Sequence, residues 1–178
     1  RSTTSNYHPL KGDLKTDINT NLGHFTDVLP NVKGTFNLVS TWFAEHPKGF
    51  YSSTALCREH LLESYCETLN KTYRIFRLCN VIGNDPRASK EKNGLEYMLK
   101  RVVRGEEVQV YEGDCYRDVL HVEDTCQAIH LCLTNPSLSN QVVNIGRGTS
   151  HRMVDLIDYA IKATGSKSTI RRVPVPVF

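Results

Sequence analysis

Short apolar segments alternate with helical segments along this chain, and this alternation constrains the fold more than any other feature. Segments rich in β-branched residues predict buried strands at TFNLVST (35–41), TYRIFRLC (72–79), EVQVY (107–111), RDVLHV (117–122) and QVVNIG (141–146). Strands that alternate with helices usually pair in parallel. The sequence therefore predicts an α/β fold with a largely parallel sheet.

Apolar residues at helical spacing predict the helices between these strands. They lie near 14–29, 95–104, 123–133 and 150–164, and a further helix, which Ser53 or Thr54 caps, extends to Leu69. Thr149 or Ser150 is the expected cap of the last helix, and Gly165 its end. The segment NVIGNDPRASKEKNG (80–94) is predicted to be a loop.

The composition is that of an ordinary globular protein. The 178 residues are 39% hydrophobic and 23% charged, and the formal net charge of +3 is too small to indicate nucleic-acid binding. No apolar segment approaches the roughly 18 residues of a membrane helix, and the polar start is not a signal peptide. The six cysteines have neither C-x-x-C nor zinc-ligand spacing, so we expect free buried thiols in a reducing compartment, no metal site and a cytoplasmic location.

A hydroxyl and a phenol mark one candidate site. In an open α/β sheet, ligands bind beyond the carboxyl ends of the strands. Thr41 ends a predicted strand and Tyr51 opens the next helix, so the two side chains could share a proton with a substrate alcohol. A phenol is a poor base at neutral pH unless a nearby cation lowers its pKa. The position one helical turn after Tyr51 holds Ala55, and a strand-end hydroxyl with a packed aromatic remains the alternative.

Four segments together resemble a known family. In order they are NLVST with GFYSSTALCREHLLESYCETLN, YRIFRLCNVIG, YEGDCYRDVLHVEDTCQAI and VVNIG. This order is similar to that of the nucleotide-sugar epimerase/dehydratase branch of the extended short-chain dehydrogenase/reductases. The resemblance covers about residues 17–178. It implies part of a Rossmann-like NAD(P)-binding domain at 1–85, and at 86–178 a smaller α/β lobe, mainly substrate-binding, with interleaved Rossmann elements.

The resemblance implies a role for individual residues. Tyr51 matches the general base that takes a proton from a sugar hydroxyl while hydride leaves to NAD or NADP, and it also contacts that cofactor. Thr41 matches the residue that hydrogen-bonds the same sugar oxygen. The reaction that the resemblance implies is epimerisation, or a related oxidation and reduction, of a nucleotide-diphosphate sugar.

The resemblance also implies substrate-binding residues. Asn80 matches an asparagine that contacts substrate, Arg117 matches the arginine that pairs with the diphosphate, and Tyr111 lies where relatives hold the base. Guanidinium suits that role because it meets phosphate oxygens bidentately. Alternatives stay open: Arg117 in a salt bridge to Asp118 or Asp124, and Asn80 as a turn-capping amide.

The sequence departs from the family pattern in several places. It has no G-x-x-G-x-x-G, and Ala55 stands where the family has lysine. Trp42 and Phe43 replace the Asp-Glu of the 4,6-dehydratases, which disfavours dehydration, and the loop before Tyr51 is short. Omitted segments, an engineered alanine or a natural degenerate relative could each explain these departures, and we favour omission or truncation.

Three functions therefore remain open. The first is an NAD(P)-dependent nucleotide-sugar epimerase or related oxidoreductase. The second is a non-catalytic nucleotide-sugar or dinucleotide binder that acts as a regulatory subunit, and the third is a catalytically disabled or structural fragment. The resemblance implies a homodimer through the Tyr51 helix and the helix before it, with no nucleic-acid or membrane partner.

Overall fold

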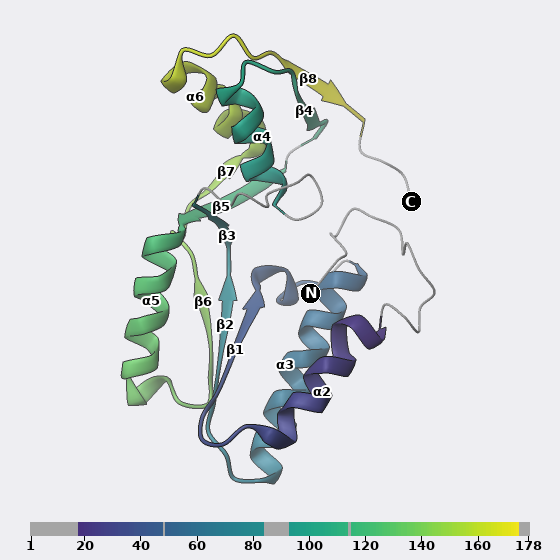
Figure 1. Ribbon diagram of the computed structural model, residues 1–178, viewed down its shortest axis with the longest axis vertical. Helices are drawn as coiled ribbons and strands as arrows, with labels where there is room; N and C mark the ends of the chain where they lie inside the picture. The colour runs from purple at the N-terminus through teal and green to yellow at the C-terminus, as the bar shows by residue number, and fades with distance from the viewer. Residues whose placement is uncertain (1–17, 48, 84–92, 114, 175–178) are drawn as a thin grey trace. The chain divides into compact units, whose positions relative to one another are not determined.

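The computed structural model describes residues 18–47, 49–83, 93–113 and 115–174, and these form two compact units (Figure 1). Unit 1 comprises Arg1–Cys79 and Asp124–Ile145, and unit 2 comprises Asn80–Glu123 and Gly146–Phe178. The chain crosses between the units where β2 gives way to β3, within α5, and after β6. Each unit is described by itself below.

Unit 1 is built on a three-stranded parallel sheet in the order β1-β2-β6. The strands are β1 (Phe36–Thr41), β2 (Tyr73–Leu78) and β6 (Gln141–Ile145). In Figure 1, α2 (His24–Val28) and α3 (Phe50–Thr68) lie on one side of the sheet, and α5 (Val122–Thr134) lies beside β6. The π-helical turn η1 (Asn19–Gly23) precedes α2, and the 3₁₀ turn η2 (Leu29–Asn31) follows it.

The core of unit 1 lies between α3 and one face of the sheet. Alternate strand residues point to this face. The buried cluster that results consists of Leu29, Phe36, Leu62, Cys66, Tyr73 and Ile75. Burial raises the pKa of the Cys66 thiol, more than the nearby Lys71 ammonium lowers it.

A buried ionic cluster also joins α3 to the sheet. The Glu59 carboxylate, 1% exposed, accepts hydrogen bonds from the Arg77 guanidinium of β2 at 2.6 and 3.0 Å. It also accepts one from the Ser40 hydroxyl of β1. The hydrogen bond to Glu59 raises the pKa of Arg77 further above its ordinary value. Each charge in the cluster therefore has its partner inside the fold.

Unit 2 contains two small sheets. In the first, β3 (Asn80–Ile82) pairs in parallel with β5 (Tyr116–His121), which pairs antiparallel with β7 (Ser150–Arg152). In the second, β4 (Val108–Tyr111) pairs in parallel with β8 (Ile170–Val173). The helices α4 (Gly94–Val103) and α6 (Met153–Thr164) pack together over a core of Leu95, Val102, Val108, Val110, Met153 and Ile157.

Gly83 allows the chain after β3 to pass close to the start of α5. A Cβ added there would lie 2.2 Å from Cγ1 of Val122, which is far inside van der Waals contact. The N–H of Gly83 donates to the Glu96 carboxylate at 3.3 Å, and Glu96 also accepts from the side chain of Asn93, the N-cap of α4. Any residue larger than glycine would separate these segments.

The predicted α/β fold and its five strands are confirmed, but several element boundaries are wrong. Residues 80–82 form β3 instead of part of a loop. The first three residues of the predicted 150–164 helix form β7, so this helix, α6, begins at Met153 and has Arg152 as its N-cap. The helix of Tyr51 begins at Phe50 with Gly49 as N-cap, instead of at Ser53 or Thr54. The predicted 14–29 helix continues to Asn31 as a series of short turns, and its first four residues lie outside the described ones.

Candidate functional site

Thr41 and Tyr51 lie near each other along unit 1, on either side of a short 3₁₀ turn. Thr41 ends β1 and is the N-cap of η3 (Trp42–Ala44), where its hydroxyl oxygen accepts from the N–H of Phe43 at 3.4 Å. Tyr51 is half-buried in the first turn of α3, and α3 packs against η3. The phenol of Tyr51 makes no hydrogen bond to any described residue. The local order of the sequence therefore brings a hydroxyl and a phenol to one end of unit 1.

Ala55 lies one turn after Tyr51 and is fully buried. Its methyl group packs inside the fold and offers no hydrogen-bond donor. Glu59 lies one turn further along α3, and its carboxylate accepts hydrogen bonds from Ser40 and Arg77. Ala55 therefore provides no cation beside Tyr51.

Asn80 and Arg117 lie on neighbouring strands of unit 2. Asn80 opens β3, and its side-chain amide donates to the carbonyl of Asp118 at 3.2 Å. Arg117 is the second residue of β5, is half-buried, and donates to the carbonyl of Tyr116 at 2.8 Å. The structure therefore brings these two predicted residues together through Asp118.

Asp118 is a buried residue of the site that sequence reasoning considered only as a salt-bridge partner. Its side chain is 2% exposed, and its two carboxylate oxygens accept from the N–H groups of Arg147 at 3.1 Å and Gly148 at 2.8 Å. Gly148 has φ +79, a left-handed conformation that favours glycine and turns successive N–H groups toward one acceptor. The R-D pair at 117–118 and the glycines that follow VVNI are the sequence features that could have indicated this contact.

Tyr111 is the last residue of β4 and lies in the second sheet of unit 2. It is half-buried and its partner in β8 is Val173. The predicted site residues thus divide between the units, with Thr41 and Tyr51 in unit 1 and Asn80, Tyr111 and Arg117 in unit 2. Their convergence on one substrate stays a prediction.

Three further features of the described part of the chain concern membrane helices, metal ligands and cysteines. No helix within it is both long and apolar enough to cross a membrane. No group of three or more metal-ligating side chains occurs there either. All six cysteines are free thiols, as the spacing predicted, although only Cys66 is buried.

Comparison with known proteins gives a family match. The family model "NAD dependent epimerase/dehydratase family" matches residues 27–146. No protein with a curated description matches the chain significantly. Among solved structures, the chain is similar to a UDP-glucose 4-epimerase from Thermotoga maritima with UDP-glucose, at 25% identity over 91% of this chain and 59% of that chain, with a TM-score of 0.75.

Two further structures show the same fold. A Thermus thermophilus UDP-glucose 4-epimerase in complex with NAD matches 99% of this chain and 64% of its own, with 22% identity and a TM-score of 0.79. A Bacillus cereus UDP-glucuronic acid 4-epimerase in complex with UDP-glucuronic acid and NAD matches 97% and 60%, with 20% identity and a TM-score of 0.81. The chain spans about three fifths of the length of the structures it matches.

Proposed function

Because the chain belongs to the NAD-dependent epimerase/dehydratase family, we propose that it modifies a nucleotide-diphosphate sugar, most simply by epimerising one carbon of the sugar. The observation that supports this most is the arrangement of β3 and β5, which places Asn80 and Arg117 on one sheet of a chain with this family match. Substrates of this class combine a diphosphate, which a guanidinium can bind through two hydrogen bonds, with a reacting sugar hydroxyl, which must give up its proton to a base.

In this proposal Tyr51 is the general base. Its ionised form, the phenolate, takes the proton of a sugar hydroxyl, and the Thr41 hydroxyl hydrogen-bonds the same sugar oxygen. Since the Thr41 oxygen already accepts from Phe43, its own hydrogen can be donated to the substrate oxygen. Tyr51 and Thr41 would then hold one sugar carbon in a fixed orientation while its hydroxyl loses and regains a proton.

The cofactor of this family is NAD. When bound, NAD would supply an acceptor and donor of hydride for the sugar carbon. Tyr51 fits contact with NAD, because its half-buried phenol has no hydrogen-bond partner among the described residues. Ala55 does not fit, because a buried methyl group cannot hydrogen-bond a ribose. NADP remains the alternative to NAD.

The remaining residues would hold the substrate in unit 2. Arg117 would pair with the diphosphate, Asn80 would contact the sugar through its amide, and Tyr111 would stack on the nucleotide base. Each of these groups matches a chemical feature of a nucleotide sugar: charge, hydroxyl groups and an aromatic ring.

Free thiols support a reducing compartment such as the cytoplasm.

A second candidate function is a non-catalytic nucleotide-sugar binder. Ala55 favours it, since no lysine at this position places a cation beside the Tyr51 phenol. In this alternative Arg117, Asn80 and Tyr111 keep their roles, and Tyr51 and Thr41 bind the sugar without transferring a proton.

Turnover by designed variants of the full-length protein distinguishes these two functions. With NAD and a panel of nucleotide sugars, Tyr51→Phe should lower any epimerisation rate by about 100-fold or more. Ala55→Lys should raise the rate, and Ala55→Met, equally bulky but uncharged, should not. Because position 55 is buried, the melting temperature of both variants is the control for overpacking. A lysine variant that folds and binds but stays inactive on the whole panel would exclude the epimerase and leave the binder.

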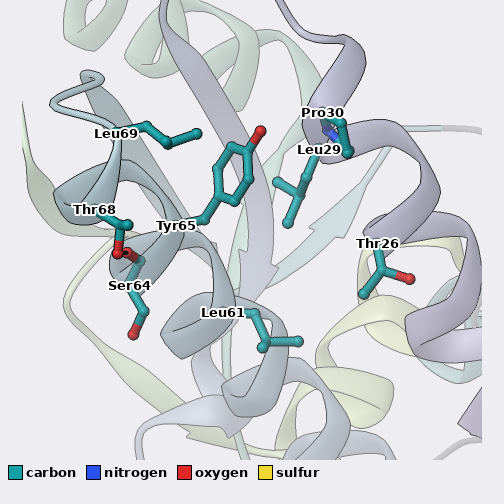
Figure 2. Close-up of a pocket in the computed structure, with 8 residues that line it drawn as sticks. All are labelled: Thr26, Leu29, Pro30, Leu61, Ser64, Tyr65, Thr68 and Leu69. Atoms are coloured by element: carbon teal, nitrogen blue, oxygen red, sulfur yellow. Dashed lines mark hydrogen bonds between the residues drawn. The ribbon is translucent and has the colours of Figure 1, made fainter.

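An apolar groove of unit 1 supports a homodimer. The groove, of about 460 Å³, lies between α3 and the segment formed by α2 and η2. Figure 2 shows the Tyr65 ring projecting between Leu69 and Leu29. Leu61 and Leu69 are 38% and 48% exposed there. We propose that the same groove of a second copy covers these leucines.

Sedimentation tests the proposed dimer. Leu61→Asp should yield monomers, because a carboxylate cannot be buried unpaired in an apolar interface. Leu131→Asp, at a 60% exposed leucine of α5, is the matched control and should leave the dimer intact. Equal dimer fractions in both variants would place the interface elsewhere.

A further inference from the structure

One face of the first sheet of unit 2 holds three polar side chains on three neighbouring strands. Paired residues of adjacent strands project to the same face, and so do residues two apart on one strand. Asn80 of β3 pairs with Val119 of β5, and Arg117 of β5 pairs with His151 of β7. Asn80, Arg117 and His151 therefore share a face.

His151 lies directly opposite Arg117 in this arrangement. Cβ atoms of directly opposed residues in an antiparallel pair are about 4.5–5.5 Å apart. The imidazole is exposed and makes no hydrogen bond or ion pair with the described part of the chain. A protonated imidazole this close to a guanidinium is unfavourable unless an anion lies between them.

The position of this pair is fixed by the buried Asp118. Its carboxylate holds the N–H groups of Arg147 and Gly148, just before β7 begins at Ser150. Because Ser150 pairs with Asp118, the next residue, His151, is held in register with Arg117. The hydrogen bonds of Asp118 therefore determine that His151, and not a neighbouring residue of β7, lies opposite Arg117.

We propose that His151 is a second diphosphate-binding residue, which grips the substrate diphosphate together with Arg117. The inference rests on the proposed function, because it takes the diphosphate of a nucleotide sugar as the ligand of Arg117. Histidine gains a positive charge between about pH 8 and pH 5, so binding is stronger at the acidic end of this range. Two donors on neighbouring strands offer the two phosphates more hydrogen bonds than Arg117 alone.

Other charged groups near His151 leave the sign of this pH dependence unchanged. Arg152 and Asp155 neutralise each other through hydrogen bonds of 2.7 and 2.9 Å, and Asp118 accepts from two peptide N–H groups. Among the described residues, the charged or titratable groups on its own and neighbouring elements are Arg117 and His121 of β5, Arg147 of the preceding loop, Arg152 and Asp155 around the start of α6, and Arg172 of β8.

The test is the dissociation constant of UDP-glucose measured by calorimetry at about pH 6 and about pH 8. UDP-glucose is the right probe because both its phosphates are esterified and hold a constant charge over this range. The full-length protein should bind it at least about fivefold more tightly at the lower pH. His151→Gln should bind equally at both pH values and match the original protein at the higher one.

His121→Gln is the matched control, since its imidazole lies on the same strand as Arg117 but interacts with Glu123, and it should keep the full pH dependence. An unchanged pH dependence in His151→Gln would overturn the proposal. Arg117→Ala should lose about tenfold at both pH values. Undiminished affinity in Arg117→Ala would instead overturn the proposed function itself.

Proton NMR of the imidazole provides a second readout that does not depend on a variant. Because binding and protonation are reciprocally linked, saturating UDP-glucose should move the midpoint of the His151 titration to higher pH. The His121 midpoint should stay where it is. A His151 midpoint that does not move with ligand would contradict a direct contact with the diphosphate.

Discussion

Glu59 in unit 1 and Asp118 in unit 2 are both almost fully buried carboxylates, yet their partners differ in kind. Glu59 accepts from two side chains, the Arg77 guanidinium and the Ser40 hydroxyl. Asp118 accepts from two peptide N–H groups. A buried carboxylate can thus be balanced by a full opposite charge or by main-chain dipoles, and the first arrangement loses far more when one partner is removed.

The largest effect should come from breaking the ion pair of unit 1. Glu59→Leu removes the hydrogen-bonded counter-charge of the largely buried Arg77 and should lower the free energy of unfolding by about 3–5 kcal/mol in urea titrations. The double variant Glu59→Leu with Arg77→Met removes both charges and should recover much of this loss. Equal losses in the single and double variants would show that the charges are not coupled.

A smaller effect should follow from changing the carboxylate of unit 2. Asp118→Asn replaces one acceptor oxygen with an NH₂ group that faces a peptide N–H, which should lower the free energy of unfolding by about 1–3 kcal/mol. Asp124→Asn, at an exposed position, is the control and should change it little. A loss as large as that of Glu59→Leu would remove the difference between the two carboxylates.

The core of unit 1 should also show a pH dependence from Cys66. Burial raises the pKa of this thiol above its ordinary value of 9.0. In alkali the unfolded chain therefore loses this proton first, so the thiol's contribution to stability is complete below about pH 9 and falls as the pH rises through the folded-state value. Unfolding free energies of the original protein and Cys66→Ala, compared from about pH 7 to pH 11, should run parallel below about pH 9, and above it the original protein should lose stability faster. Parallel curves throughout would show that the thiol titrates alike in both states.

The smallest effect should come from an exposed ion pair of unit 2. Lys162 and Asp158 are 2.6 Å apart but 74% and 50% exposed. Solvent and salt screen such pairs. Lys162→Gln should therefore leave the melting temperature nearly unchanged. A drop comparable to that of Asp118→Asn would mean that distance alone, without burial, decides the strength of these interactions.

Local patterns in the sequence were enough to predict most of the fold. The β-branched strands and the helical apolar spacing depend on residues close in sequence, so β1, β2, α4 and α5 were found within a few residues. The strands β3, β7 and β8 were missed. The polar residues of β7 and β8 form strands only by pairing with the distant β5 and β4.

The candidate site divides in the same way. Thr41 and Tyr51 are local features: the structure places Thr41 at the end of β1 and Tyr51 in the first turn of α3, and their roles stay predictions. Asp118 was not predicted as a fixed point of the site, because its partners are main-chain groups 29 and 30 residues further along. The pairing of Arg117 with His151 depends on the strand register, which no motif in the sequence specifies.

A competition experiment tests most directly whether this protein binds nucleotide-diphosphate sugars. UDP-glucose bound to the full-length protein is titrated with UDP or with glucose, and displacement is followed by calorimetry. The proposed function predicts that UDP displaces the ligand, while a large molar excess of glucose does not, because the diphosphate and the base provide most of the contacts. Displacement by glucose, or no detectable binding of UDP-glucose at millimolar concentration, would contradict the proposed function.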